Sequence, residues 1–220
     1  HVSQNTAANH INKFYEDFEN LKNRKFDGMI ITGAPVEQME FEEVDYWEEL
    51  CEIMEWTKTH VTSTFHICWG ALPEKLFGIY KHKVYEKRTP LVRGFNDYFL
   101  APHSRHTTVS REDIHNCEAL TVLAESEEAG VFLCMAHDGK QIFAMGHAEY
   151  DRVTLHNEYM RDLGKHLPIH VPYNYYPDDD YRKRPELTWR ASSNGLYTNW
   201  LNYYVYQTTP YDVALGCRPS

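Results

Sequence analysis

The sequence predicts an α/β fold, with a mostly parallel sheet that carries helices on both faces. An apolar run at 26–32 and a β-branched run at 61–67 are both typical of buried strands, and an amphipathic stretch at 42–58 lies between them. A strand, a helix and a strand in this order indicate a right-handed crossover between parallel strands. Ligands of such sheets gather at the carboxyl ends of the strands, so the turns at Gly33 and Cys68 are predicted neighbours.

The composition fits one folded domain, which we predict to span residues 1–220. Hydrophobic residues make up 42% of the 220 residues, enough for a core. The net charge of −10 argues against a nucleic-acid partner, and no apolar run is long enough to span a membrane. The five cysteines are widely spaced and form no CxxC motif, which predicts a reducing cytoplasmic location and no bound metal.

The remaining elements follow from periodicity and turn signals. Helical spacing of apolar residues predicts helices at 7–22, 151–165 and 194–206. Short apolar runs predict further strands at 120–124, 130–136 and 141–145. Asp138-Gly139 between the last two runs is a strong hairpin signal.

Cys68 is the predicted nucleophile. It ends the run 61–67 and is followed by Trp69-Gly70-Ala71, the outline of a turn that lifts a side chain above the sheet. The backbone N–H of Trp69 could then stabilise an oxyanion. The alternative is a buried structural thiol, the common fate of free cysteine, and Cys51 on the apolar face of its helix fits that description.

His147 and Glu149 are the predicted base and its partner. They directly follow the apolar run 141–145, and residues i and i+2 of an extended chain point the same way. Glu149 could therefore hold the imidazole in one tautomer and stabilise its protonated form. The alternative is a solvent-exposed pair after a strand.

Several motifs give a specific resemblance that runs from about residue 8 to residue 212. They are FDGMIITGAPVE, FEEVDYWEEL, HICWGA, LVRGFNDYFLAPHSRH, VLAESEEAG, GHAEYD and NWLNYYVYQTTPYD. Together with the order Cys, then His-x-Glu, they resemble the homoserine O-acyltransferases of methionine biosynthesis, within the flavodoxin-like, class I glutamine amidotransferase-like superfamily. True amidotransferases usually have glycine two residues before the cysteine, where this chain has His66.

The resemblance implies a ping-pong acyl transfer. Cys68 takes the acyl group from acyl-coenzyme A, and His147 then activates the hydroxyl of L-homoserine. It further implies an oxyanion hole at Trp69 and Gly33-Ala34, no permanently bound cofactor, and a homodimer. Lys75, Ser104 and Arg161 match its homoserine-binding positions, although Lys75 and Arg161 alone would pass for solvated residues.

Glu37 and Ser104 match positions that select the acyl group. A glutamate at position 37 fills the room that a succinyl carboxylate needs and repels its charge, so we expect acetyl-coenzyme A as donor. A succinyltransferase and a cysteine amidase or hydrolase of the same fold are the alternatives. A binding module whose Cys68 senses oxidation is another, but it has no use for His147 and Glu149.

The chain departs from the family pattern in two places. An N-terminal strand–helix–strand portion is expected before the match. A second segment, with the helix behind the nucleophile, is expected between CWGA and LPEK. Here Ala71 leads directly to Leu72-Pro73, and proline disfavours a helix at the preceding residue. Either the sequence joins two segments across omitted residues after Ala71, which we expect, or the chain is a deletion variant.

Overall fold

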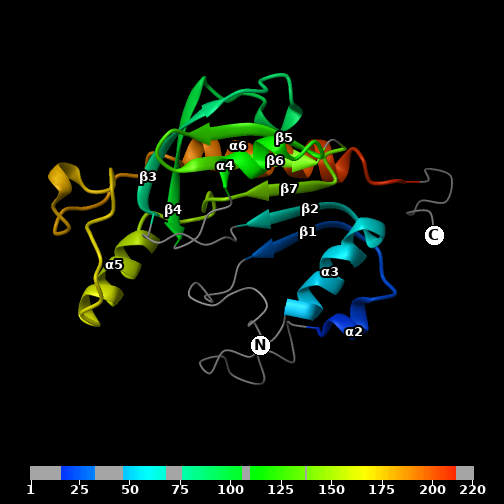
Figure 1. Cartoon of the computed structure of the whole chain (residues 1–220), viewed down its shortest axis with the longest axis horizontal. Coiled ribbons are helices and arrows are strands. Elements are labelled where there is room, and N and C mark those ends of the chain that lie inside the picture. The colour runs from blue at the N-terminus through cyan, green and yellow to red at the C-terminus, as the bar shows by residue number, and fades with distance from the viewer. Residues whose placement is uncertain (1–15, 33–46, 68–75, 106–109, 137, 212–220) are drawn as a thin grey trace.

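The structure, a computed structural model, describes residues 16–32, 47–67, 76–105, 110–136 and 138–211 (Figure 1). Seven strands within these residues form one sheet. They are β1 (Phe26–Thr32), β2 (Val61–Ile67), β3 (Leu76–Val84), β4 (Tyr98–Arg105), β5 (Leu120–Ser126), β6 (Gly130–Ala136) and β7 (Gln141–Ala144). The α-helices are α2 (Phe18–Leu21), α3 (Trp47–His60), α4 (Arg111–Asn116), α5 (Thr154–Gly164) and α6 (Arg190–Asn199).

The parallel part of the sheet is β1–β2–β7. Thr32 of β1 pairs with Ile67 of β2, and Ile67 pairs with Ala144 of β7, so the three strands end at the same edge. Helix α3 connects β1 to β2, as the strand–helix–strand pattern predicts. The residues that follow each strand leave the sheet at this edge, and the predicted catalytic residues are among them.

The α/β class is confirmed, but the described sheet is mixed rather than mostly parallel. Its order is β1-β2-β7-β6-β5-β3-β4, and every pairing from β7 to β4 is antiparallel. The reason is local connection: only four residues separate β6 from β7, and so short a connection joins antiparallel strands, whereas parallel strands need a crossover of about a dozen residues or more. Strands β3 and β4, which form one end of the sheet, are absent from the sequence prediction.

Helices cover both faces of the sheet, as predicted. On one face Trp200, just beyond α6, packs its ring against Phe65 of β2 with 5.4 Å between centroids. On the other face His66 Nε2 lies 2.5 Å from Gln141 Oε1, and the Gln141 amide donates to Thr57 of α3 at 3.3 Å. Phe65 and His66, which are adjacent on β2, therefore point to opposite faces of the sheet: Phe65 faces the layer of α6, and His66 faces the layer of α3.

The last predicted helix is present at the expected place, but it consists of two parts. α6 is followed by a π-helix, η4 (Trp200–Tyr206), which buries Trp200 and Val205. The wider π turn puts residues five apart on one face, whereas the 3.6-residue period of the prediction placed Tyr203 or Tyr204 there. Helix α5 agrees with the predicted helix 151–165. Of the predicted helix 7–22, only α2 falls within the described residues.

α5 lies beside the antiparallel end of the sheet (Figure 1). A second apolar cluster, separate from the main core around Phe65 and Phe132, holds it there. Phe77 and Ile79 of β3 and Leu155 of α5 are fully buried in it, together with Trp189. This packing fixes α5 relative to β3 and its neighbour β4, so side chains on α5 and β4 can meet in a defined geometry.

Candidate active site

His147 and Glu149 form the pair that their spacing predicts. His147 Nδ1 lies 2.7 Å from Glu149 Oε1, and the two side chains are 17% and 39% exposed. The backbone N–H of His147 donates to the Pro102 carbonyl at 2.9 Å, which ties this turn to β4. A neutral imidazole that donates from Nδ1 carries its lone pair on Nε2, the arrangement that a general base requires.

The pair stands at the edge where β1, β2 and β7 end. Because Ile67 and Ala144 pair in register, the residue after β2 and the residues after β7 leave the same edge of the sheet. Cys68, Trp69, Gly33, Ala34, Glu37 and Lys75 lie outside the described residues. Their roles stay predictions.

The remaining cysteines within the described residues differ in setting. Cys134 is buried in β6, and burial raises the pKa of its thiol to about 12. A thiol with that pKa stays protonated at neutral pH and is a poor nucleophile. Cys51 is half-buried on α3 and Cys117 is exposed. Cys134 therefore fits the structural role that buried cysteines usually have.

Ser104 and Arg161, two of the predicted substrate residues, lie on facing elements. Ser104 is buried on β4, and its hydroxyl donates to Glu158 Oε2 of α5 at 2.5 Å. Arg161, one turn further along α5, is 56% exposed, and its Nε donates to Asp162 Oδ1 at 2.6 Å. The structure thus brings α5 and the end of β4 together, with a cationic group at the surface.

Sequence reasoning missed two residues that join these parts. Glu158 accepts from Ser104 and also, through Oε1, from the Tyr150 hydroxyl at 2.7 Å. The ring of Tyr150 stacks on His147, with 4.3 Å between centroids and 18° between planes. One signal was available: Glu158 precedes Arg161 by three positions, so the two share a face of a helix.

Three buried polar side chains are linked to one another close to the proposed base. His82 Nε2 and His103 Nε2 are 3.0 Å apart, and Arg105 Nε donates to His103 Nδ1 at 3.2 Å. Burial, with the Arg105 charge, lowers the pKa of His82 to about 3 and that of His103 well below its usual range. Both rings are therefore neutral at pH 7. Gly146 passes close to the His103 ring, because an added Cβ there would lie 2.9 Å from His103 Cε1.

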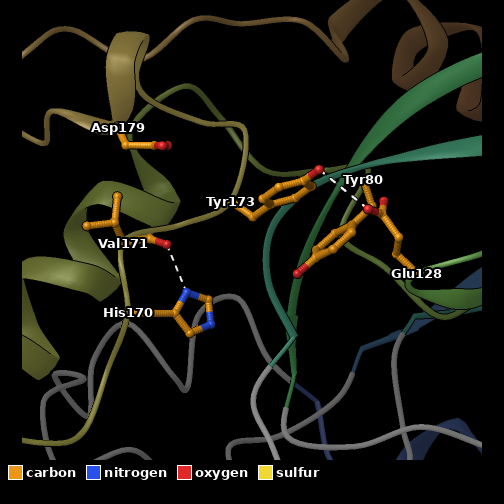
Figure 2. A pocket seen from close by; sticks show the side chains of 6 residues that line it. All are labelled: Tyr80, Glu128, His170, Val171, Tyr173 and Asp179. Carbon is orange, nitrogen blue, oxygen red and sulfur yellow. Dashed lines mark hydrogen bonds between the residues drawn. The ribbon is translucent and has the colours of Figure 1, made fainter.

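A separate cavity of about 500 Å³ opens beside β3 (Figure 2). Its lining residues are Tyr80, Glu128, His170, Val171, Tyr173 and Asp179. Figure 2 shows the rings of Tyr80 and Tyr173 together near Glu128, across from His170, Val171 and Asp179. The Tyr173 hydroxyl donates to Glu128 at 3.4 Å. The described residues of the predicted active site do not line this cavity.

Within the described residues, no group of three or more His, Cys, Asp or Glu side chains could hold a metal ion. The helices described here also include none with the length and apolar character to cross a membrane.

The overall architecture places the chain in a known fold class. It is similar to a glutamine amidotransferase from Thermotoga maritima, with a TM-score of 0.55 and 15% identity over 80% of this chain and 78% of that one. A glutamine amidotransferase from Methylobacillus flagellatus gives a TM-score of 0.56 and 12% identity over 80% and 76%. The chain thus has a class I glutamine amidotransferase-like α/β fold.

The sequence narrows this class to one family. The model of the homoserine O-succinyltransferase family matches residues 1–211, so the chain belongs to that family. Homoserine O-acetyltransferase of Lachnoclostridium phytofermentans is 62% identical over 97% of this chain and 75% of its own length. The enzyme of the same name from Agathobacter rectalis is 59% identical over 96% and 73%, and that from Bacteroides thetaiotaomicron is 54% identical over 97% and 74%. The resemblance drawn from the motifs is confirmed.

Proposed function

We propose that the chain is a homoserine O-acetyltransferase, which moves the acetyl group of acetyl-coenzyme A to the hydroxyl of L-homoserine. Relatives at 54–62% identity carry that name. The structural observation that supports the chemistry best is the 2.7 Å contact between His147 and Glu149 at the common end of β2 and β7. Together they favour a thiol-based acyl transfer with a histidine base.

The reaction proceeds in two halves through a thioester on Cys68. The Cys68 sulfur attacks the acetyl carbonyl, the bond from that carbonyl to the coenzyme A sulfur breaks, and His147 passes the thiol proton to the departing thiolate. The homoserine hydroxyl then gives its proton to His147 and attacks the new thioester. O-acetylhomoserine leaves, and Cys68 recovers its proton. N–H groups of Trp69 and the Gly33-Ala34 loop stabilise both oxyanions.

Three side chains bind the amino-acid substrate in this proposal. Arg161 is exposed on α5 and presents a guanidinium, the group best suited to pair with a carboxylate. Ser104 lies on the facing strand, and Lys75 completes the set. The chain acts as a homodimer in the cytoplasm. Acetyl-coenzyme A enters as a co-substrate, and no other cofactor takes part.

The acyl donor is the point at which the names of the relatives and of the family differ. The family carries the name of a succinyltransferase, whereas the similar relatives are named acetyltransferases. Glu37, with Ser104, decides between them. A succinyl carboxylate about 4 Å from the Glu37 carboxylate would be disfavoured by about 4 kcal/mol at an effective dielectric of about 20. A neutral acetyl group meets no such penalty.

Two measurements test the proposal. Intact-mass analysis with acetyl-coenzyme A alone should show one acetyl group, which peptide mapping places on Cys68 and which Cys68→Ala abolishes. Release of that group should then require homoserine; release by water alone at the same rate would indicate a hydrolase. An acetyl group on Cys117 or Cys134 instead would contradict the assignment.

The donor is tested by kcat/KM for acetyl- and succinyl-coenzyme A in wild type and Glu37→Gly. Wild type should prefer the acetyl donor, and the variant should gain succinyl activity. Equal preference in the two proteins would mean that Glu37 does not choose the donor.

A further inference from the structure

Tyr150 lies against the proposed base, and hydrogen bonds of its backbone hold it in place. Its ring covers one face of His147, nearly parallel to it, at 4.3 Å between centroids. The backbone N–H of Tyr150 donates to the His147 carbonyl at 3.2 Å, and Trp189 Nε1 donates to the Tyr150 carbonyl at 2.9 Å. Trp189 is itself fully buried. The turn that carries both rings is therefore anchored in the second apolar cluster.

The phenol of Tyr150 is held at its other end by Glu158. It donates to Glu158 Oε1 at 2.7 Å, and Ser104 donates to Oε2 of the same carboxylate at 2.5 Å. Hydrogen bonds to an ionised acceptor are stronger than bonds between neutral groups. Glu158 stands on α5, which Leu155 fixes in the core. One carboxylate thus sets the distance between the hydroxyl on β4 and the ring that faces the base.

We infer that Tyr150 is a positioning residue for the acyl transfer: its ring holds the plane of the His147 imidazole, and Glu158 locks that ring to Ser104. The inference rests on the proposed function, because it assumes that His147 transfers protons. Tyr150 contacts the base through its ring. Its effect is on the orientation and the protonation of His147.

The effect of the Tyr150 ring on the protonation of His147 has a predictable direction. The face of an aromatic ring carries partial negative charge and attracts a cation stacked upon it. Tyr150 therefore favours the imidazolium form of His147 and raises the pH at which the base becomes neutral and active. Replacing the ring by an aliphatic side chain should move the acid limb of the rate profile to lower pH by about half a unit. A residue with a merely structural role would lower stability and leave this limb in place.

The experiment measures the pH profile of kcat/KM for L-homoserine, with acetyl-coenzyme A saturating, in wild type and three variants. Tyr150→Leu removes ring and hydroxyl, and Tyr150→Phe removes only the hydroxyl. Glu158→Gln removes the charge of the anchor and one of its two acceptor oxygens. Tyr150→Leu should lower kcat/KM by about 100-fold and shift the acid limb, since small misplacements of a catalytic group are costly. Tyr150→Phe should lower kcat/KM by about 10-fold and leave the limb in place.

The link through Glu158 is tested by combining variants. If Tyr150 and Glu158 act as one unit, Tyr150→Phe/Glu158→Gln should be no slower than the slower single variant. Additive losses would overturn the link. Tyr159→Phe is the matched control, because Tyr159 belongs to the same cluster and lies on α5 as well. It should keep the wild-type rate and profile.

The outcomes separate the inference from the proposed function. A wild type without a Cys68 adduct or homoserine-dependent transfer would refute the function itself. A wild type that transfers acetyl while Tyr150→Phe and Tyr150→Leu match it in rate and profile would overturn the inference alone. Thermal melting of each variant accompanies the kinetics. If Tyr150→Leu does not fold, Tyr150→Phe, Glu158→Gln and their combination still decide the matter.

Discussion

Acidification should destabilise this fold through two histidines buried in its main core. His82 and His103 are fully buried, with their Nε2 atoms 3.0 Å apart, and both rings pack against Phe132. Burial lowers the pKa of His82 to about 3, and the nearby Arg105 charge adds to the effect. The pKa of His103 falls in the same direction, again chiefly by burial.

The sign and size of the effect follow from proton linkage. A histidine with a lowered folded pKa binds its proton only after unfolding. Its contribution is therefore complete above the unfolded pKa of about 6.5 and is lost as the pH falls below it. Between pH 7.5 and 5.5, His82 alone should cost about 1.4 kcal/mol of unfolding free energy, and His103 should add about as much. The total of about 3 kcal/mol corresponds to about 6–12 °C in Tm for a chain of this size.

The assay is urea denaturation of wild type and His82→Gln at both pH values. The variant is less stable throughout, because glutamine packs poorly in an apolar core, but its pH dependence should be smaller by about 1.4 kcal/mol. His166→Gln, at an exposed histidine, is the control and should keep the wild-type dependence. A His82→Gln protein that loses as much stability between the two pH values as wild type does would refute the reasoning.

Three shorter predictions follow from single contacts. Glu125→Ala should cost about 2 kcal/mol in urea denaturation, because this 4% exposed carboxylate accepts from Arg111, His115 and Tyr85; an unchanged midpoint would contradict it. Tyr197→Phe should leave Tm nearly unchanged, since the buried Tyr197 hydroxyl lies near the Glu149 carboxylate without a hydrogen bond of normal length; a large drop would show that this contact stabilises the fold. Gly146→Ala should cost about 1–3 kcal/mol and slow acyl transfer, because its Cβ would lie 2.8 Å from the Pro102 carbonyl, the acceptor of the His147 N–H.

The parallel part of the fold was predictable from local sequence patterns. The run at 61–67 was recognisable because β2 lies buried between two helical layers. The run at 26–32 does form a strand, but β1 stands at the end of the described sheet, and none of its residues is buried, so the expectation of a buried strand there is wrong. His147 and Glu149 were predictable for a similar reason. Their hydrogen bond joins residues two apart, so the spacing alone contains the geometry.

The strands at the antiparallel end of the sheet could not be recognised in the sequence, because they contain many polar residues. β3 alternates Lys81, His82 and Lys83, which resembles a solvated segment until His82 is seen to be buried. Its burial depends on His103, 21 positions away, which supplies the polar contact. The same limit applies to the active site. Glu158 joins Ser104 and Tyr150 across 54 and 8 positions, and such contacts exist only after the elements pack together.

The division of the sheet into a parallel and an antiparallel part has a consequence for how the protein folds. β3 pairs with β4, β5 with β6, and β6 with β7, and each of these pairs joins strands that are near neighbours in the chain. In contrast, β2 meets β7 with His66 and Gln141 75 positions apart. Pairings that close long loops form late, because the entropy of closure is lost before any contact compensates for it. In refolding, we expect native-like circular dichroism to return before catalytic competence, since β2 reaches β7 last and the site is assembled only then.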